Sequence, residues 1–263
     1  MISFLTAFTP LTDLAMVAAN VASLLVARGD LEAARRKFES ALTTWRSTGE
    51  RSYAAYALIG LGDIDLKQAN FGEAAKYLQQ SLDERLALGE KGTAAESQLA
   101  LAQLALEQNR LAEAEKLARQ AVVEFEAEQA GDNIAAGQSL LARIALERRD
   151  LGAARKALAI AQKLADTSSD IGVKAAVAVT EARVAIAAGQ PRVALQQMTT
   201  FGQRFKAGAA VQDVFESRLT LAAAKMASGR TADADADLDL LKWDASKIGF
   251  NAIAKKTDQT RRR

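Results

Sequence analysis

The chain has 263 residues, of which 49% are hydrophobic and 25% charged, and 34 basic against 32 acidic side chains give a formal net charge of +2. It contains no Cys and no His. The lack of imidazole and thiol groups excludes a Ser-His-Asp triad, His-ligated metals, disulfides, zinc knuckles and cysteine nucleophiles. About a fifth of the residues are alanine and only 2 are proline, so we expect an almost entirely helical backbone.

The N-terminal stretch is apolar and nearly uncharged. Residues 1–27 contain no Lys or Arg, and Asp13 is their only charged residue. A secretory signal needs a basic segment before its apolar core, so none is expected here. Pro10 and Asp13 interrupt the stretch, which argues against a membrane span. We expect residues 1–11 to form a short lead-in segment and the first helix to begin at Thr12.

A short turn recurs along the chain and defines an internal repeat. The third residue of each turn, taken as an anchor, is Leu31, Phe71, Leu111, Leu151, Pro191 or Thr231. The anchors are 40 residues apart without slippage. A fixed period of this size is typical of arrays in which each unit is one supersecondary element.

Two columns of the repeat hold only small residues. Alanine follows each anchor by three positions, at Ala34, Ala74, Ala114, Ala154, Ala194 and Ala234. Nine positions before each anchor stand Ala22, Gly62, Ala102, Ala142, Ala182 and Ala222. Apolar residues accompany both columns at helical spacing, so each repeat is predicted to be a helix hairpin whose axes approach closely at the small residues. A single hairpin cannot bury its apolar face, so it stacks on the next.

The pattern predicts all-α architecture. First helices are expected at about 12–28, 51–68, 92–108, 132–148, 171–188 and 211–228. Second helices are expected at about 31–48, 71–88, 111–128, 151–166, 191–206 and 231–247. The repeat array then spans 12–248, and a capping helix with a basic tail spans 249–263. Phe250 and Ile253 are expected to cover the last hairpin, while Lys255, Lys256 and residues 261–263 are expected to be frayed and solvated. A contact of this basic run with nucleic acid or anionic lipid is the alternative.

Two segments resemble the tetratricopeptide repeat. They are Gly29 to Ala34 followed by Phe38 and Ala41, and Leu61-Gly62 with Ala74, Leu78 and Ser81. The period of 40 instead of 34 resembles the arrays of bacterial signalling proteins, including regulatory ATPases and regions C-terminal to serine/threonine kinases, nucleotide cyclases and winged-helix regulators. The resemblance implies a right-handed superhelical solenoid of about six antiparallel hairpins plus a capping helix. It also implies that a peptide or protein binds in the concave groove lined by the first helices, and a cytoplasmic location.

Positions on the first helices that face the expected groove supply the candidate binding residues. They are Tyr56, Asp63, Glu96, Gln103, Arg143, Arg183 and Glu216. Arg143 and Arg183 occupy adjacent repeats, and paired guanidinium groups suit an acidic peptide or a carboxylate. Local pairing with Glu147 and Lys67 is the alternative for Arg143 and Asp63. Arg183 has no such local partner and is the best single candidate.

The remaining motifs do not predict a phosphate-binding loop, a cation site or a chaperone-tail clamp. The segment 89–93 has the wrong spacing for a P-loop and is expected to be a turn. The acidic series Asp233, Asp235, Asp237 and Asp239 is expected to be a solvated face, with a cation site as the alternative. Ala19, Ser23, Ile59 and Asp63 lack the Lys and Asn that chaperone-tail clamps of the resembled family use, so no such clamp is expected.

We therefore expect a non-enzymatic interaction or regulatory module without metal or cofactor, part of a larger bacterial signalling protein. Neither nucleic-acid binding nor membrane insertion is expected. Two alternatives stay open: a sensor domain that binds a small effector, which needs a deep closed pocket, and a self-assembly scaffold.

Overall fold

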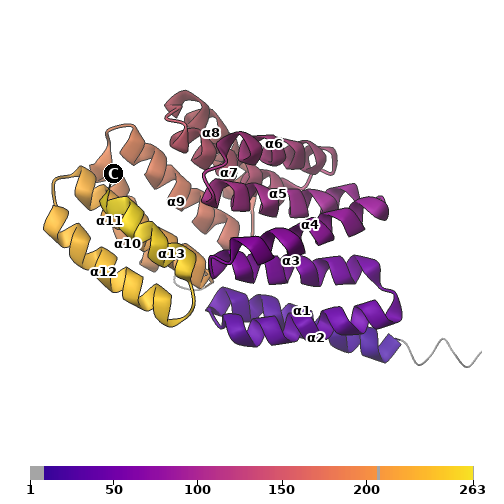
Figure 1. Ribbon diagram of the computed structural model, residues 1–263. Helices are drawn as coiled ribbons and strands as arrows, with labels where there is room; N and C mark the ends of the chain where they lie inside the picture. The colour runs from indigo at the N-terminus through magenta and orange to yellow at the C-terminus, as the bar shows by residue number, and fades with distance from the viewer. Residues whose placement is uncertain (1–8, 206–207, 263) are drawn as a thin grey trace, which may run out of the picture.

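The computed structural model describes residues 9–205 and 208–262, which form thirteen α-helices and no strand (Figure 1). Twelve of the helices make six antiparallel hairpins, and α13 (Asn251–Arg261) follows the last one. The hairpins are α1 (Thr9–Arg28) with α2 (Leu31–Thr48), α3 (Arg51–Lys67) with α4 (Phe71–Ala87), α5 (Lys91–Glu107) with α6 (Leu111–Ala127), α7 (Gly131–Glu147) with α8 (Leu151–Thr167), α9 (Ile171–Ala187) with α10 (Pro191–Arg204), and α11 (Val211–Ala227) with α12 (Thr231–Lys247). The predicted helical solenoid of six hairpins and a cap is confirmed.

The largest difference from the predicted helix bounds is at the start of α1, which begins at Thr9 instead of Thr12. Pro10 lies in the first turn, where its missing N–H has no helical partner to lose, so the helix can begin before it. Residues 1–8 of the predicted lead-in segment lie outside the described residues.

The turns between helices contain a residue whose backbone is in the left-handed, positive-φ conformation. Gly89 supplies it after α4 with a φ of +75°. Of the segment 89–93, predicted to be a turn, Gly89 and Glu90 connect α4 to α5, and residues 91–93 are the first residues of α5. At four equivalent turns the same conformation is adopted by a residue with a side chain: Ala69, Asn109, Gln129 and Arg149. A side chain in this region costs about 1–2 kcal/mol. Packing of the flanking helices therefore holds these turns in place without glycine.

The two small columns are where the helices touch. The six alanines that follow the anchors are all 0% exposed. In the other column Gly62 stands where the remaining repeats have alanine, and a Cβ on it would lie 2.7 Å from the side chain of Leu78. The predicted close approach of the paired helices at these columns is confirmed.

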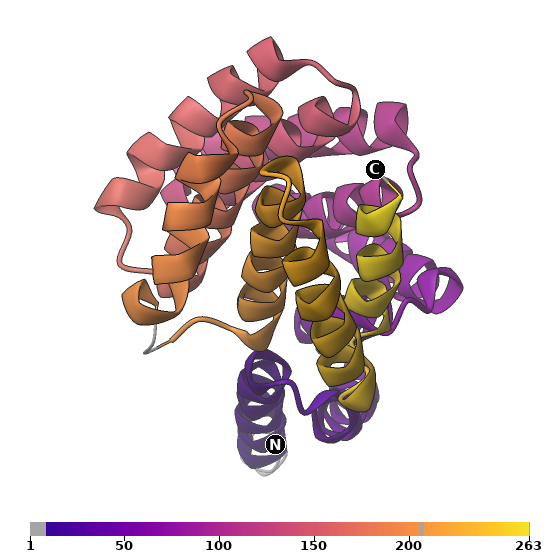
Figure 2. The same cartoon turned by 90° about the vertical axis from the view of Figure 1, so that its left-hand side faces the viewer.

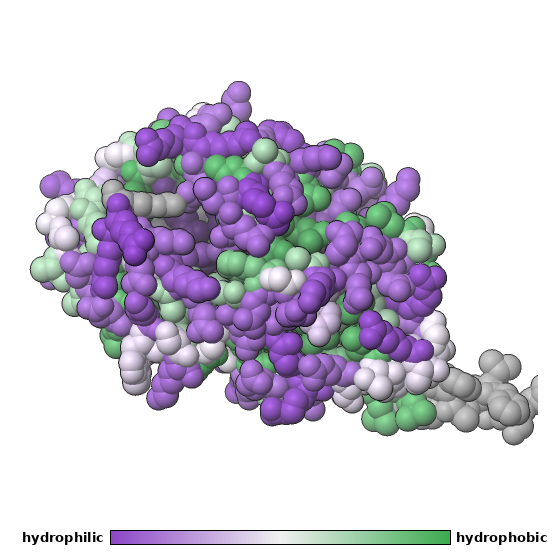
Figure 3. Space-filling view, viewed as in Figure 1, coloured by the Kyte–Doolittle hydropathy of each residue, from purple (hydrophilic) through white to green (hydrophobic). Residues whose placement is uncertain are grey.

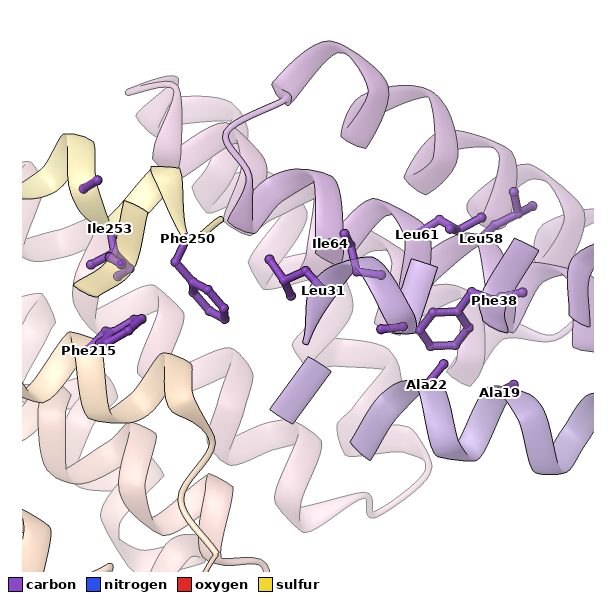
Figure 4. Packing of buried hydrophobic residues seen from close by; sticks show 14 of the residues in the cluster. Ala19, Ala22, Leu31, Phe38, Leu58, Leu61, Ile64, Phe215, Phe250 and Ile253 are labelled. Carbon is purple, nitrogen blue, oxygen red and sulfur yellow. The ribbon is translucent and has the colours of Figure 1, made fainter. Parts of the chain in front are cut away.

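The superhelix curls until its two ends meet. One core cluster combines residues of α1, α2 and α3 with residues of α11, α12 and α13. Phe250 is fully buried, and its ring packs edge-on against Phe215 at 5.4 Å between centroids. Figure 4 shows the Phe250 side chain between Phe215 and Leu31, and Figure 2 shows the ends of the array side by side. Phe250 and Ile253 cover the last hairpin as predicted, but they cover the first two hairpins as well.

The first helices are not evenly spaced around this curve. α9 packs directly against both α7 and α11, whereas the first helices of earlier repeats meet only marginally. A buried hydrogen bond joins the hydroxyl groups of Ser139 on α7 and Thr180 on α9 at 2.7 Å. The array therefore curves more tightly in its C-terminal half, which brings α13 back toward α3.

A bulky side chain in a small column should separate the paired helices. We expect Ala114→Leu to lower the free energy of unfolding by about 1–3 kcal/mol, because the added volume has no space between α5 and α6. The matched control is Ala112→Leu, on the exposed face of the same helix, which should change stability by less than about 0.5 kcal/mol. Urea unfolding followed by far-ultraviolet circular dichroism measures both. Equal effects of the two substitutions would contradict the packing role of the column.

Candidate functional site

Polar side chains from five helices meet between the first helices and α13. They are Gln103 and Glu107 of α5, Arg143 of α7, Arg183 of α9, Glu216 of α11 and Lys256 of α13. We call these six residues the interior network. Its members come from four consecutive repeats and from the capping helix, so the closed superhelix is what assembles them.

Glu216 lies at the centre of the network. Its carboxylate accepts hydrogen bonds from Lys256 at 2.9 Å and from Gln212 at 3.1 Å, and it forms an ion pair with Arg183. Burial alone raises the pKa of Glu216, but Lys256, Arg183 and Arg143 outweigh it and hold the pKa well below its usual range. Glu216 is therefore a buried, ionised group held by three cations.

Lys256 joins the two ends of the network. Its ammonium group donates to Glu107 at 2.7 Å as well as to Glu216. The predicted capping helix is confirmed as α13, whose Ala252, Ile253, Ala254 and Thr257 are buried. The prediction that the basic run is frayed and solvated is wrong for Lys256, which pairs with Glu107 and Glu216. Ile253, Ala254 and Thr257 lie on one face at helical spacing, so packing against the array orders the segment. Arg263 lies outside the described residues.

Arg143 and Arg183 lie near each other, as their adjacent repeats predicted. Burial lowers the pKa of Arg143, and the charge of Arg183 lowers it further. Arg143 donates to Gln103 at 2.9 Å and lies 3.6 Å from Glu107. Arg183, expected to lack a partner, instead pairs with Glu216 and donates to Thr220 at 3.2 Å. Its partners lie more than 30 residues away on the next repeat, where the spacing of local helix pairs does not reach.

The other three predicted residues lie outside the network. Tyr56 contacts the first hairpin: its hydroxyl lies 2.9 Å from that of Ser23, and its ring packs edge-on against Phe38. Asp63 pairs with Lys67 at 2.5 Å, which confirms the local alternative. Glu96 pairs at 2.8 Å with an arginine of α4 in the preceding hairpin. Sequence reasoning missed Glu107 and Lys256, although Glu107 lies four positions after Gln103 on the same helix face.

The acidic series on α12 is paired with cations. Its ion pairs are Asp233 with Arg230, Asp237 with Lys225, and Asp235 and Asp239 with Arg261. Over residues 9–205 and 208–262, no three acidic side chains are grouped so that they could hold a metal ion.

One cavity lies away from the network. Its volume is about 120 Å³, and it is lined by Trp45, Arg46, Gly49, Arg51, Ala54, Leu58 and Glu84 at the junction of α2, α3 and α4. Within the described part of the chain, the indole N–H of Trp45 has no hydrogen-bond partner. The space suffices for a few water molecules.

The apolar helix at the N-terminus is packed on the array. The segment Leu11–Arg28 is the one described stretch long and apolar enough to cross a membrane by length and composition. The same helix pairs with α2 along its length and buries three alanines against it. Only 17% of this segment is buried, and both mostly buried core helices and signal sequences near an N-terminus pass the same test of length and composition.

Removal of the Lys256 ammonium group should destabilise the closed superhelix. We expect Lys256→Met to lower the free energy of unfolding by about 2–3 kcal/mol, because Glu107 and Glu216 then stay buried with less positive charge around them. Lys116→Met, an exposed lysine of α6, is the control and should change stability by less than about 0.5 kcal/mol. Denaturant unfolding measures the difference. A stability loss no larger than that of the control would show that Lys256 does not hold α13.

Asp213, in the first turn of α11, should make stability depend on pH. Burial raises its pKa from 3.8 to about 6, against the lowering effect of Lys67. The folded state therefore binds more protons than the unfolded state between these values, and stability falls as the pH rises through this range. We expect Asp213→Asn to be more stable than the wild type by about 1–2 kcal/mol near pH 7.5, and the difference to vanish near pH 4. Unfolding curves across this range test it. A difference that is the same at both pH values would contradict the assignment.

Comparisons with known proteins agree with this architecture. The chain matches the MalT-like TPR region model over residues 12–255. NprR, solved in complex with its cognate peptide NprX, is similar in structure with a TM-score of 0.69 at 15% identity, over 94% of this chain and 72% of that one. BtubC from P. vanneervenii is similar with a TM-score of 0.55 at 16% identity, over 92% and 91% of the two chains. No curated protein matches in sequence. The family model covers nearly the whole chain, which therefore belongs to the family of MalT-like TPR regions.

Proposed function

We propose that this chain is a non-enzymatic module that binds a peptide or a segment of a partner protein on the surface lined by its first helices. The observation that carries the proposal is the interior network. Arg143, Arg183 and Lys256 keep 22%, 21% and 18% of their side chains exposed. Charged groups held in fixed positions by buried partners, yet open to solvent on one side, can orient a peptide without reorganising.

In the proposal the ligand occupies the surface around the network. Figure 3 shows a recess with hydrophilic walls next to the C-terminal end of the chain. The structure of NprR, which shares the fold, contains a bound peptide. In the proposal Gln103, Arg143, Arg183 and Glu216 make the central contacts, and Tyr56, Asp63 and Glu96 extend the surface toward the N-terminal repeats.

In the proposal, ligand binding to the array regulates a catalytic or DNA-binding region of a larger bacterial signalling protein in the cytoplasm. Family membership and the 40-residue period support this assignment. A superhelix whose ends touch can transmit binding, because a ligand that moves the first helices also strains the contact between α13 and α3.

The proposal is tested with a displayed library of random dodecapeptides. Enriched peptides are synthesised and titrated calorimetrically against the wild type and against Arg143→Gln, whose fold is checked by its melting temperature. We expect the substitution to weaken binding at least about tenfold, or about 1.4 kcal/mol. Arg119→Gln, an exposed arginine of α6 whose ion pair is with Glu115, should leave the affinity unchanged. A library that yields no binder, or equal losses in the two variants, would refute the proposed surface.

A further inference from the structure

The cavity at the junction of α2, α3 and α4 combines apolar and charged walls. We call it the Trp45 cavity. Its apolar lining consists of the buried side chains of Trp45, Ala54 and Leu58. Charged side chains from all three helices complete the lining. The cavity shares no residue with the interior network, so it is a separate place in the fold with its own chemistry.

The indole N–H of Trp45 has no acceptor. The residue is 0% exposed, and within the part of the chain that the structure describes its N–H makes no hydrogen bond. The ring of Tyr53 packs against the indole at 5.5 Å between centroids and helps to fix its position. A buried donor without an acceptor destabilises the fold, and such donors almost always have a partner in the protein, in water or in a ligand.

The repeat shows that this missing acceptor is specific to the first hairpin. The residue 40 positions after Trp45 is the buried Arg85, which donates to Glu96 on the next first helix at 2.8 Å. Tyr56 is the equivalent of Glu96 on α3, and its hydroxyl lies against α1 instead. The remaining repeats hold side chains without a donor in this column: Phe125, Ala165, Phe205 and Ala245. Trp45 therefore depends on an occupant of the cavity for its acceptor.

A guanidinium group without a partner lines the same cavity. Arg51 and Glu84 form an ion pair with each other at 2.6 Å. Over residues 9–205 and 208–262, Arg46 has no ion pair or hydrogen bond, although it also lines the cavity. Two donors without acceptors, one buried and one charged, thus face the same space as the apolar side chains. A water molecule can accept from the indole, but it leaves the charge of Arg46 unpaired.

We propose that the Trp45 cavity binds a short-chain monocarboxylate such as propionate. One carboxylate oxygen accepts the indole N–H of Trp45, the other pairs with Arg46, and the alkyl carbons lie against Ala54 and Leu58. The volume of about 120 Å³ sets the length of the chain. A cavity of about 150 Å³ holds benzene, with its six carbon atoms, so this one has room for about five non-hydrogen atoms, as in propionate.

Nuclear magnetic resonance of the full chain labelled with ¹⁵N tests the site. The chain has 2 tryptophans and hence two indole N–H signals. Sodium propionate, titrated at constant ionic strength, should shift the Trp45 signal with a dissociation constant of about 1–10 mM, as expected for so small a ligand. Trp243, 61% exposed on α12, is the internal reference and should not shift. A Trp45 signal that does not move up to roughly 100 mM propionate would show that water alone fills the cavity and would overturn the proposal.

Two comparisons test the carboxylate and its partner. Propionamide has the same size without the charge and should bind about five- to tenfold more weakly, because hydrogen bonds to a charged group are stronger. Arg46→Gln should weaken propionate binding about two- to fivefold, since exposed ion pairs contribute modestly. Arg36→Gln, at an exposed arginine of the same helix, is the control and should bind like the wild type. Equal affinities for propionate and propionamide, or equal losses in the two variants, would overturn the assignment.

Discussion

The distance between helix axes at the two small columns is the constraint on which the rest of the structure depends. A methyl group or a hydrogen is all that fits where the helices of a hairpin cross, and the six alanines after the anchors have no exposed surface at all. This contact recurs every 40 residues, so the two helices of every hairpin are held equally close to each other. The curvature that accumulates over six hairpins then brings α13 against α3, although the two helices are far apart in the sequence.

Closure gives the interior network two roles at once. The ion pairs of Lys256 tie the capping helix to α5 and α11, and the same side chains line the surface where a ligand is proposed to bind. Buried charges are costly unless each has its partner, and here three cations surround Glu216. A ligand that draws one of these groups away therefore disturbs the others. Binding and the closed shape of the superhelix are coupled through the same few contacts.

The first and last helices of the described array differ in how far their apolar side chains are buried. At the C-terminal end Phe250 and Ile253 bury the apolar surface of the last hairpin. On α1 the large apolar side chains of Leu14, Val17 and Leu24 are exposed.

The sequence by itself determined the helices, the turns, the small columns and the covering of the last hairpin, because these depend on spacings within one repeat. It also placed Gln103, Arg143, Arg183 and Glu216 on one surface, since all lie at fixed positions of the first helices. It misjudged Arg183 and Lys256, whose partners Glu216 and Glu107 come from other elements. Only the tertiary structure decided that the ends meet and that the charges are shared across the interior. A small rotation per repeat is nearly invisible in one hairpin, and its sum over six fixes which distant side chains touch.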